Sequence, residues 1–314
     1  MEAEKEIRKM WCMFGYQDYK NKVLEILREK YGEDVVRETT VTKNNNTKLE
    51  GIILHVGTSA ASPIIYFDSR QNVYTDLDVK GMVRTAEEQF KVIKHFTDKA
   101  VEDARNWKKM QTRIFPKVIH YEKNKEMLMK TPHVRFLDLA VVFFYQTNEM
   151  FPELGEGTVM VHDGMKNVWD VNEEQLMKYS MKNLKEMKCA CKKMDEFAEM
   201  CGISDEEEAL VSSTLPLYIL TTYDGMFGAA AMLNRKFMEK ACKKMQCQKL
   251  WVIPSSIHEV LLLPYDYEIA AKNLQGICVD VNKTLNPEDI LSDSIYVYDD
   301  AEKQIDFADV RGNS

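Results

Sequence analysis

The spacing of apolar residues predicts that helices and strands alternate along the chain. In the N-terminal third, two segments have apolar residues at helical intervals, and three shorter runs are rich in β-branched residues. The expected helices cover residues 16–31, ended by Gly32, and 79–93, and the expected strands cover 35–41, 49–56 and 64–67. The polar stretch 43–47 contains three asparagines, which tolerate a left-handed backbone and favour a hairpin turn. We therefore expect a helix, three strands and a second helix in this order.

The remaining two thirds of the chain continue this alternation, mainly through strands that follow each other closely. The expected strands cover 114–121, 136–145, 158–161, 216–221, 250–253, 257–263, 294–298 and 304–307, and the expected helices cover a region from about Asn172 to Gly202 together with 237–245 and 270–285. Pro116 places the first strand near a sheet edge, whereas residues 141–145 are β-branched and aromatic, which is typical of a buried central strand. This pattern predicts an α+β fold, with mainly antiparallel sheets on which several amphipathic helices pack.

The same pattern divides the chain into four segments. We expect an N-terminal appendage over residues 1–15, a helix–strand–strand–strand–helix subdomain over 16–110, a C-terminal α+β subdomain over 111–308 and a tail over 309–314. A chain of 314 residues is long enough for one large domain or two ordinary ones with a substantial core. Both arrangements are compatible with the pattern.

The overall charge argues mildly against a nucleic-acid-binding protein. The chain has 42 basic and 50 acidic residues, a formal net charge of -8, and no basic block stands out, whereas nucleic-acid binders usually have a basic face. A local basic patch is one interpretation of the lysines that recur on an expected helix at positions 182, 185, 188, 192 and 193. A solvated helix face explains the same spacing and is the interpretation that we prefer.

The apolar pattern gives no sign of a membrane or secretory protein. Residues 1–9 carry charges throughout, and the longest apolar run, 137–145, is too short for the ~20 residues that cross a bilayer. We therefore expect a cytoplasmic protein.

The seven cysteines agree with that location, because they contain no C-x-x-C pair and favour free reduced thiols. No metal or other cofactor is predicted. A metal site formed by Cys189, Cys191 and Cys201 is the weaker alternative, since clusters of this kind bind zinc.

The string Ile253–Pro264 is the strongest local candidate for chemistry. It places Ser255, Ser256, His258 and Glu259 where one expected strand turns into the next. In one interpretation His258 and either serine form a base–nucleophile pair. However, the string has no G-x-S-x-G elbow, and strand alternation directs His258 and Glu259 to opposite faces. We prefer a structural interpretation, in which the histidine bonds to turn backbone and the serines cap the turn.

Two aspartates are further candidates. Asp138 lies in an apolar run near His133 and Arg135, and a carboxylate buried there needs a partner. These three residues form either a binding site or a structural ion pair, and we prefer the ion pair. Asp224 precedes Gly225, which suits either a ligand cleft lined by backbone or the preferred strand-to-helix turn.

Six short strings carry a family resemblance through their order and spacing. They are Val41–Asn45, Tyr121–Lys125, Pro132–Ala140, Tyr223–Ala229, Ile253–Pro264 and Ile290–Asp299. Together they resemble the bacterial family catalogued as domain of unknown function 5688, from about residue 16 to about residue 308. The resemblance implies one continuous domain-like unit in a bacterial cytosolic protein, and it implies no particular activity, substrate or catalytic residue. We expect the first fifteen residues and the acidic stretch Asp205–Glu208 to depart from the family.

Three classes of function follow from these observations. The preferred class is a non-catalytic cytosolic protein that binds a small molecule or a protein, without nucleic-acid or membrane partners, because no catalytic set has consistent spacing. The second class is a hydrolase or transferase whose site folding assembles from His258, Ser255 or Ser256, Asp224 and Asp138. The third class is a nucleic-acid-associated accessory protein.

Overall fold

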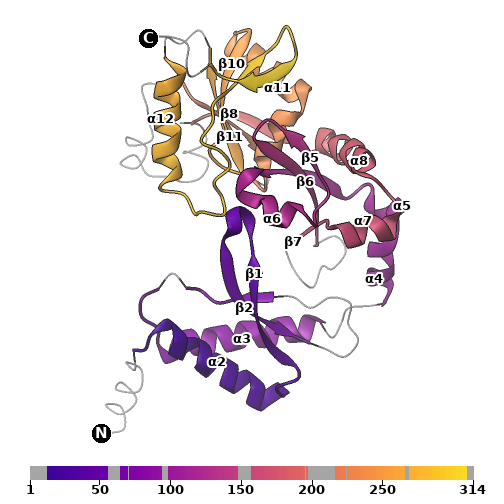
Figure 1. The fold of residues 1–314 in the computed structure, drawn as a ribbon, viewed down its shortest axis with the longest axis vertical. Coiled ribbons are helices and arrows are strands. Elements are labelled where there is room, and N and C mark those ends of the chain that lie inside the picture. Colours follow the sequence, from indigo (N-terminus) through magenta and orange to yellow (C-terminus); the bar gives the residue numbers. More distant parts are fainter. Residues whose placement is uncertain are drawn as a thin grey trace. The chain divides into compact units, whose positions relative to one another are not determined.

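A computed structural model describes residues 13–55, 64–69, 71–93, 98–147, 157–194, 196, 216–223, 225–265 and 269–309. The chain forms two compact units, which Figure 1 shows as ribbons. Unit 1 contains Met1–Lys43, Thr47–Ala104 and Thr147–Gly157, and unit 2 contains Asn44–Asn46, Arg105–Gln146 and Thr158–Ser314. The division into four segments that we expect from the sequence stays a prediction.

Unit 1 has the helix, three strands and second helix that the apolar spacing predicts. In chain order they are α2 (Tyr16–Tyr31), β1 (Val36–Thr42), β2 (Lys48–Leu54), β3 (Ile64–Tyr66) and α3 (Asp76–Ile93), and α4 (Asp98–Arg105) follows. The strands form an antiparallel sheet in the order β1-β2-β3. α2 ends where expected, because Gly32 has a φ of 95° and donates its backbone N–H to the carbonyl of Arg28.

An apolar core holds unit 1 together. Leu27 of α2 and Ile52 of β2 are both 0% exposed within it. Lys20 of α2 is also buried, and its ammonium group pairs with the carboxylates of Glu38 and Glu50 on the sheet. The two carboxylates offset the cost of removing one positive charge from water.

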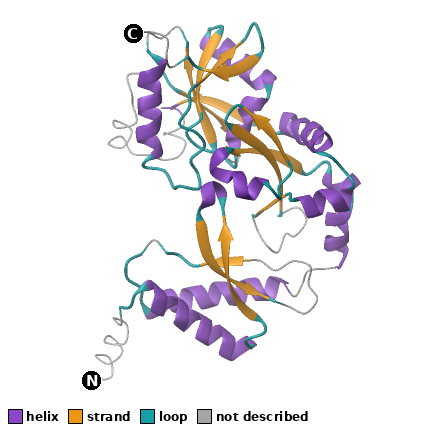
Figure 2. Cartoon of the chain, viewed as in Figure 1, coloured by secondary structure: helices purple, strands orange, loops and turns teal. Residues whose placement is uncertain are grey.

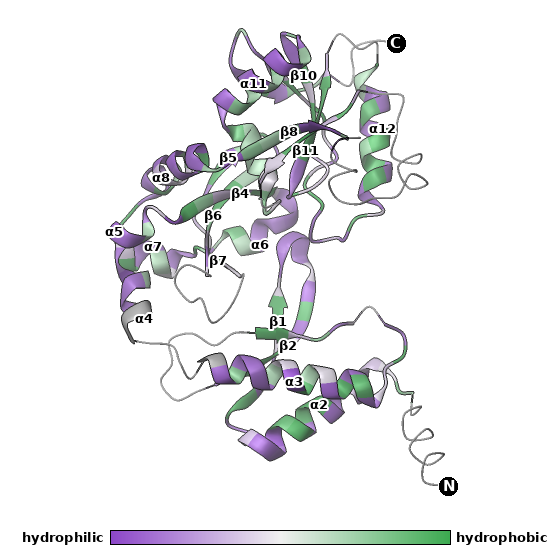
Figure 3. Cartoon of the chain, turned by 180° about the vertical axis from the view of Figure 1, so that it is seen from behind, coloured by the Kyte–Doolittle hydropathy of each residue, from purple (hydrophilic) through white to green (hydrophobic). Residues whose placement is uncertain are grey.

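Unit 2 contains a six-stranded antiparallel sheet in the order β13-β12-β10-β11-β9-β8. Its strands are β8 (Cys189–Lys193), β9 (Tyr218–Thr222), β10 (Lys249–Ile253), β11 (Glu259–Pro264), β12 (Tyr296–Asp299) and β13 (Gln304–Phe307). α11 (Arg235–Met245) and α12 (Ala271–Asn282) lie on opposite sides of this sheet (Figures 1 and 3). Leu274 and Cys278 of α12 pack in one core cluster with Trp251 and Leu263.

A second sheet of unit 2 has an apolar strand at its centre. β6 (Leu139–Gln146) pairs with β4 (Ile114–His120) along one edge and with β5 (His133–Phe136) and β7 (Thr158–Met160) along the other. β4 therefore lies at a sheet edge, as Pro116 indicates. All residues of β6 except Gln146 are buried, which confirms the predicted central strand.

The predicted strand over 136–145 is wrong at its start. Phe136 ends β5, and Leu137 and Asp138 form a two-residue turn into β6, with Leu137 at a left-handed φ of 55°. Asp138 thus lies in a hairpin turn and not inside a buried strand, a position that aspartate favours. The apolar Leu137 at the turn makes the run look continuous in the sequence.

The first long helix of unit 2 begins as predicted but ends early. The side chain of Asn172 accepts from the backbone N–H of Gln175, and the Gln175 side chain bonds back to the backbone of Asn172, which starts α8 (Glu173–Glu186). Residues 189–193 form β8 and not the predicted helix, because pairing with β9 overrides the helical spacing of the lysines. Gly202 lies outside the described residues.

The remaining helical segments of unit 2 are short. They are η1 (Asn44–Asn46), α5 (Trp107–Met110), η2 (Glu122–Asn124), α6 (Lys125–Leu128), α7 (Asp163–Trp169) and η4 (Gly228–Leu233), and Figure 2 shows helices and strands by colour. Within the described ranges, no helix has the length and apolar character that crossing a bilayer requires.

Truncating a buried isoleucine tests the core under β6. Ile119 of β4 is 0% exposed, and Ile119→Ala is expected to lower the free energy of unfolding by about 2–5 kcal/mol, because the truncation leaves a cavity. The matched control is Ile277→Ala on α12, where the side chain is 46% exposed and the change is expected to stay near 0.5 kcal/mol. Denaturant unfolding measures both variants, and equal losses contradict this placement of the core.

Candidate functional site

The segment between α12 and β12, residues 286–295, holds much of the polar chemistry of unit 2, and we call it the strap. Its backbone pairs with the loop between β10 and β11: Leu291 N–H donates to Ser255 O at 2.9 Å, and Ile257 N–H donates to Asp289 O at 2.8 Å. The side chains of this loop are therefore placed beside those of the strap. Ser255 and Ser256 are 4% and 3% exposed.

His258 lies between the strap and the turn that precedes η4. Its Nε2 is 3.3 Å from Asp289 Oδ1, and its ring stacks on Phe227 with 5.6 Å between ring centres. Its Nδ1 is 3.2 Å from Gly225 O and 3.4 Å from Phe227 N. The protonated imidazole donates to Gly225 O and to Asp289, whereas the neutral tautomer with hydrogen on Nε2 accepts from Phe227 N–H and donates to Asp289. His258 thus links three segments of the chain.

The hydroxyl of Ser256 does not face this imidazole. It accepts the backbone N–H of His258 at 3.0 Å and bonds to the carboxyl group of Glu259. Burial raises the pKa of Glu259, and the Ser256 hydrogen bond and the nearby His258 act in the opposite direction. β11 begins at Glu259, so His258 lies in the loop and not on the predicted strand face.

Asp138 is the second centre of this site. Its carboxylate accepts hydrogen bonds from the hydroxyls of Ser292 at 2.7 Å, Ser294 at 2.9 Å and Tyr296. Ser292 and Tyr296 are both 0% exposed. Burial raises the pKa of Tyr296, and the adjacent Asp138 charge adds to this effect. The turn between β5 and β6 is therefore joined to the strap and β12.

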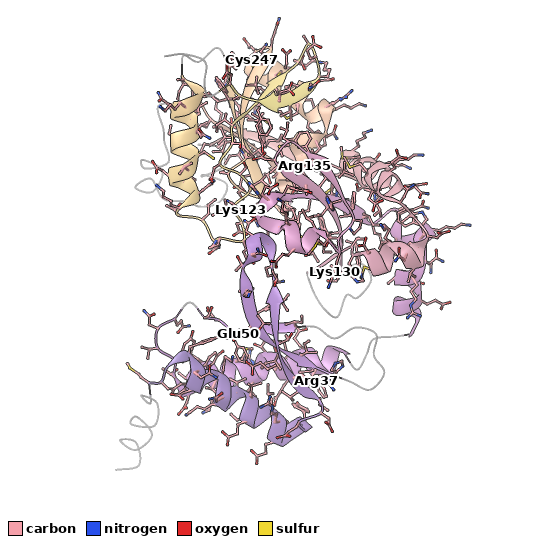
Figure 4. The ribbon with its side chains drawn as sticks, in the orientation of Figure 1. Arg37, Glu50, Lys123, Lys130, Arg135 and Cys247 are labelled. Atoms are coloured by element: carbon pink, nitrogen blue, oxygen red, sulfur yellow. The ribbon has the colours of Figure 1, made fainter. Side chains whose placement is uncertain are left out.

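The predicted ion pair around Asp138 is wrong. His133 Nδ1 is 2.8 Å from Thr131 O, and Arg135 donates its Nε–H to Leu137 O at 2.8 Å. The Arg135 guanidinium also stacks on Tyr121, 3.7 Å from the ring centre, and Figure 4 labels Arg135 on unit 2. Three neutral hydroxyls take the place of the expected cation.

Asparagines hold the other end of the strap. Asn44 and Asn45, in the turn between β1 and β2, donate side-chain N–H groups to three strap carbonyl oxygens at 2.6–2.8 Å. Asn124 binds Asn45 twice, accepting its backbone N–H at 2.8 Å and donating to its side-chain oxygen at 3.1 Å. Asn45 has a φ of 57°, which confirms the predicted left-handed turn.

His120 lies near the Asp138 centre. Its Nδ1 accepts the backbone N–H of Lys123 at 3.2 Å. Burial and the charge of Lys123 lower the pKa of His120, while Asp138 and Asp293 act in the opposite direction. Figure 4 labels Lys123 beside this part of unit 2.

The predicted site residues divide into three groups. His258, Ser255 and Ser256 meet one part of the strap, and Asp138 meets another through different partners. Asp224 lies outside the described residues. The residues that sequence reasoning missed are Asp289, Ser292, Ser294, Asn45 and Asn124. All but Asp289 lie inside the strings that carry the family resemblance, and that membership is the signal that could have found them.

The six strings converge on the strap. Each contributes a residue that bonds to the strap or to a residue bonded to it; these residues are Asn45, Asn124, Asp138, Phe227, His258 and Ser292. The sequence model of a family described as "Family of unknown function (DUF5688)" matches residues 16–300. The chain belongs to this family. No curated protein and no solved structure matches the chain.

The site holds carboxylates and imidazoles, but they are not arranged as a metal centre. Among the described residues, no group of three or more His, Cys, Asp or Glu side chains is placed to bind one ion. Cys189 and Cys191 of the weaker zinc alternative lie half-buried on β8, and Cys201 lies outside the described residues. The chemistry that the arrangement supports is hydrogen bonding.

A double-mutant cycle tests the Asp138 centre. Asp138→Ala is expected to lower the free energy of unfolding by about 2–3 kcal/mol, because it leaves three hydroxyls, those of Ser292 and Tyr296 fully buried, without their acceptor. Ser294→Ala alone is expected to cost about 1 kcal/mol, and close to nothing in the Asp138→Ala background. Additive losses in denaturant unfolding would contradict the shared hydrogen-bond network.

Glu259 predicts a defined pH dependence of stability. Because its folded-state pKa lies above the ordinary value of 4.5, folding favours the protonated carboxyl group. This contribution is fully present below pH 4.5 and is lost as pH rises through the folded pKa. Glu259→Gln is therefore expected to be more stable than the parent protein at pH 7, by an amount that shrinks toward pH 4.

The matched control for this comparison is Glu302→Gln, since Glu302 is exposed. Its unfolding midpoint is expected to follow that of the parent protein across the same pH range. A constant difference between Glu259→Gln and the parent protein at all pH values would show that the buried carboxyl group does not titrate with folding.

Proposed function

We propose that this protein is a non-catalytic, cytosolic binding protein. The observation that carries the proposal is the direction of the Ser256 hydroxyl, which bonds to its own loop and to Glu259. A serine nucleophile needs its hydroxyl within hydrogen-bond reach of a base. The ring nitrogens of His258 instead face Asp289 and the backbone of residues 225–227.

The burial of the hydroxyls supports the same conclusion. Ser255, Ser256 and Ser292 are each less than 5% exposed, so a substrate carbonyl has no access to them without rearrangement of the strap. The hydroxyls of Ser256 and Ser292 form hydrogen bonds that satisfy backbone and carboxyl groups of an irregular segment. The polar centre thereby acts as internal support for a surface that binds elsewhere.

A hydrolase or transferase is the second candidate. The observation that favours it is the His258–Asp289 pair, since a carboxylate that orients an imidazole is half of a base–nucleophile system. The His258 side chain is 37% exposed and reachable by solvent. Among the described residues, no nucleophile faces the His258 ring, so the other half of a base–nucleophile system is missing.

A fluorophosphonate probe distinguishes the two candidates. Because no hydroxyl is activated, incubation of the parent protein with the probe is expected to give an unchanged intact mass. A stoichiometric adduct on Ser255 or Ser256 that disappears in His258→Ala contradicts the non-catalytic proposal. Ser69→Ala serves as a control for labelling at an exposed serine of unit 1.

A further inference from the structure

Basic residues are concentrated on α8, β8 and α11. Residues 173–193 contain six basic and three acidic residues, and residues 235–249 contain six basic and one acidic residue. The chain as a whole carries a net charge of -8, so these segments run against the charge of the rest of the protein. A surface of this kind attracts polyanions over distances of about a Debye length.

The lysines of both helices lie on one side of each helix. On α8 they occupy positions 178, 182 and 185, and on α11 they occupy positions 236, 240 and 243, the same i, i+4, i+7 spacing. This spacing places each set on a single stripe. All six side chains are exposed, and Figure 3 colours much of both helices as hydrophilic.

Glutamates lie four residues from three of the stripe lysines, but the described residues contain no ion pair between them. Within the described part of the chain, Lys182, Lys185, Lys240 and Lys243 form no ion pair with a carboxylate. Lys244 is different, because it donates to Cys191 O at 2.8 Å and lies near Glu196. Helical lysines with a glutamate four residues away can pair with it, so lysines left unpaired on both helices are open to an anionic partner.

β8 connects the two stripes. It follows α8 directly in the chain, and its Cys191 carbonyl accepts the hydrogen bond from α11. Both views of the fold place α8 and α11 on the side of unit 2 away from α12 (Figures 1 and 3). Lys188 and Lys193, at the two ends of β8, are exposed and add positive charge between the helices.

An exposed aromatic residue lies at the same place. Tyr223 is 81% exposed and follows the last residue of β9, and its backbone N–H donates to Lys188 O at 2.8 Å. A tyrosine ring beside lysines is the arrangement with which proteins stack bases and hold the phosphates of single strands.

We propose that this surface binds single-stranded nucleic acid, with the lysines of α8 and α11 on the phosphates and Tyr223 stacked on a base. The inference rests on the proposed binding function and names its partner class. An anionic membrane fits less well, because Tyr223 is the one large exposed apolar residue among the described residues of α8, β8, α11 and the end of β9. A nucleic-acid partner differs from the partner class preferred from the sequence, because the net charge of -8 conceals the local excess of lysines on α8, β8 and α11.

Fluorescence anisotropy with a labelled 20-nucleotide oligouridine tests the proposal. The parent protein is expected to bind saturably at 50 mM salt, with an affinity that falls linearly on a logarithmic salt scale. Replacing Lys182, Lys185, Lys240 and Lys243 together by glutamine is expected to weaken binding at least tenfold. The same change reduces the salt slope by about three, since each lost phosphate contact removes about 0.7 from the slope.

The control variant removes the same charge elsewhere. Replacing Lys48, Lys80, Lys272 and Lys283 by glutamine is expected to leave the salt slope unchanged. Tyr223→Ala is expected to weaken binding at least fivefold, whereas Tyr223→Phe keeps the ring and stays within about twofold of the parent protein. Circular dichroism confirms that each variant is folded.

Three results overturn the inference. The first is the absence of saturable binding to the oligonucleotide, and the second is an equal loss of affinity in the stripe and control variants. The third is binding to phosphatidylserine vesicles that depends on the stripe lysines, without binding to the oligonucleotide. Each leaves the non-catalytic proposal standing, because that proposal depends on the fluorophosphonate test. Cleavage of the bound oligonucleotide, detected on a gel, would instead overturn the non-catalytic proposal and leave the proposed binding surface in place.

Discussion

The carboxylate of Asp138 joins the two sheets of unit 2 through hydrogen bonds. It sits in the turn of the four-stranded sheet and accepts hydroxyls from Ser292, Ser294 and Tyr296, which lead into the six-stranded sheet. Hydrogen bonds to an ionised acceptor are about twice as strong as neutral ones, so three of them fix this junction firmly. The left-handed Leu137 beside it is a strained conformation for leucine, and such strain persists only where the surroundings determine it.

The strap needs these bonds because it has almost no regular structure of its own. Backbone groups that are removed from water must find partners, and in the strap the partners come from side chains and loops. Asn44 and Asn45 satisfy carbonyl groups at one end, and Pro254 and Ser255 accept backbone N–H groups from the middle. A network of this kind is stable when all its members are satisfied and weak when one is missing. His258, with Asp289, is one member among several.

Periodic segments were predictable from the sequence, whereas the junctions between them were not. The spacing of apolar residues predicts α2 to the residue and identifies β6 as the buried strand, because each follows one period over a long stretch. The spacing misleads at Leu137, whose apolar side chain hides a turn, and at β8, where strand pairing outweighs a helical pattern of lysines. Asp138 and Ser292 are 154 residues apart, and Asn45 and Ile290 are 245 residues apart. Local reasoning has no access to partners at such separations.

The buried polar residues of the family strings and the exposed residues of unit 2 have different roles. Several residues of the family strings form hydrogen bonds to the strap or to one another. Buried polar groups of this kind specify one arrangement of a fold, and they leave little chemistry for a ligand. The outward-facing features are simpler: two lysine stripes with one spacing and a tyrosine at the end of a strand. Since a charge pattern on a surface acts only through the partner that it attracts, the function of this protein is to be sought on the face that carries the lysine stripes and Tyr223, which the net charge of the chain conceals.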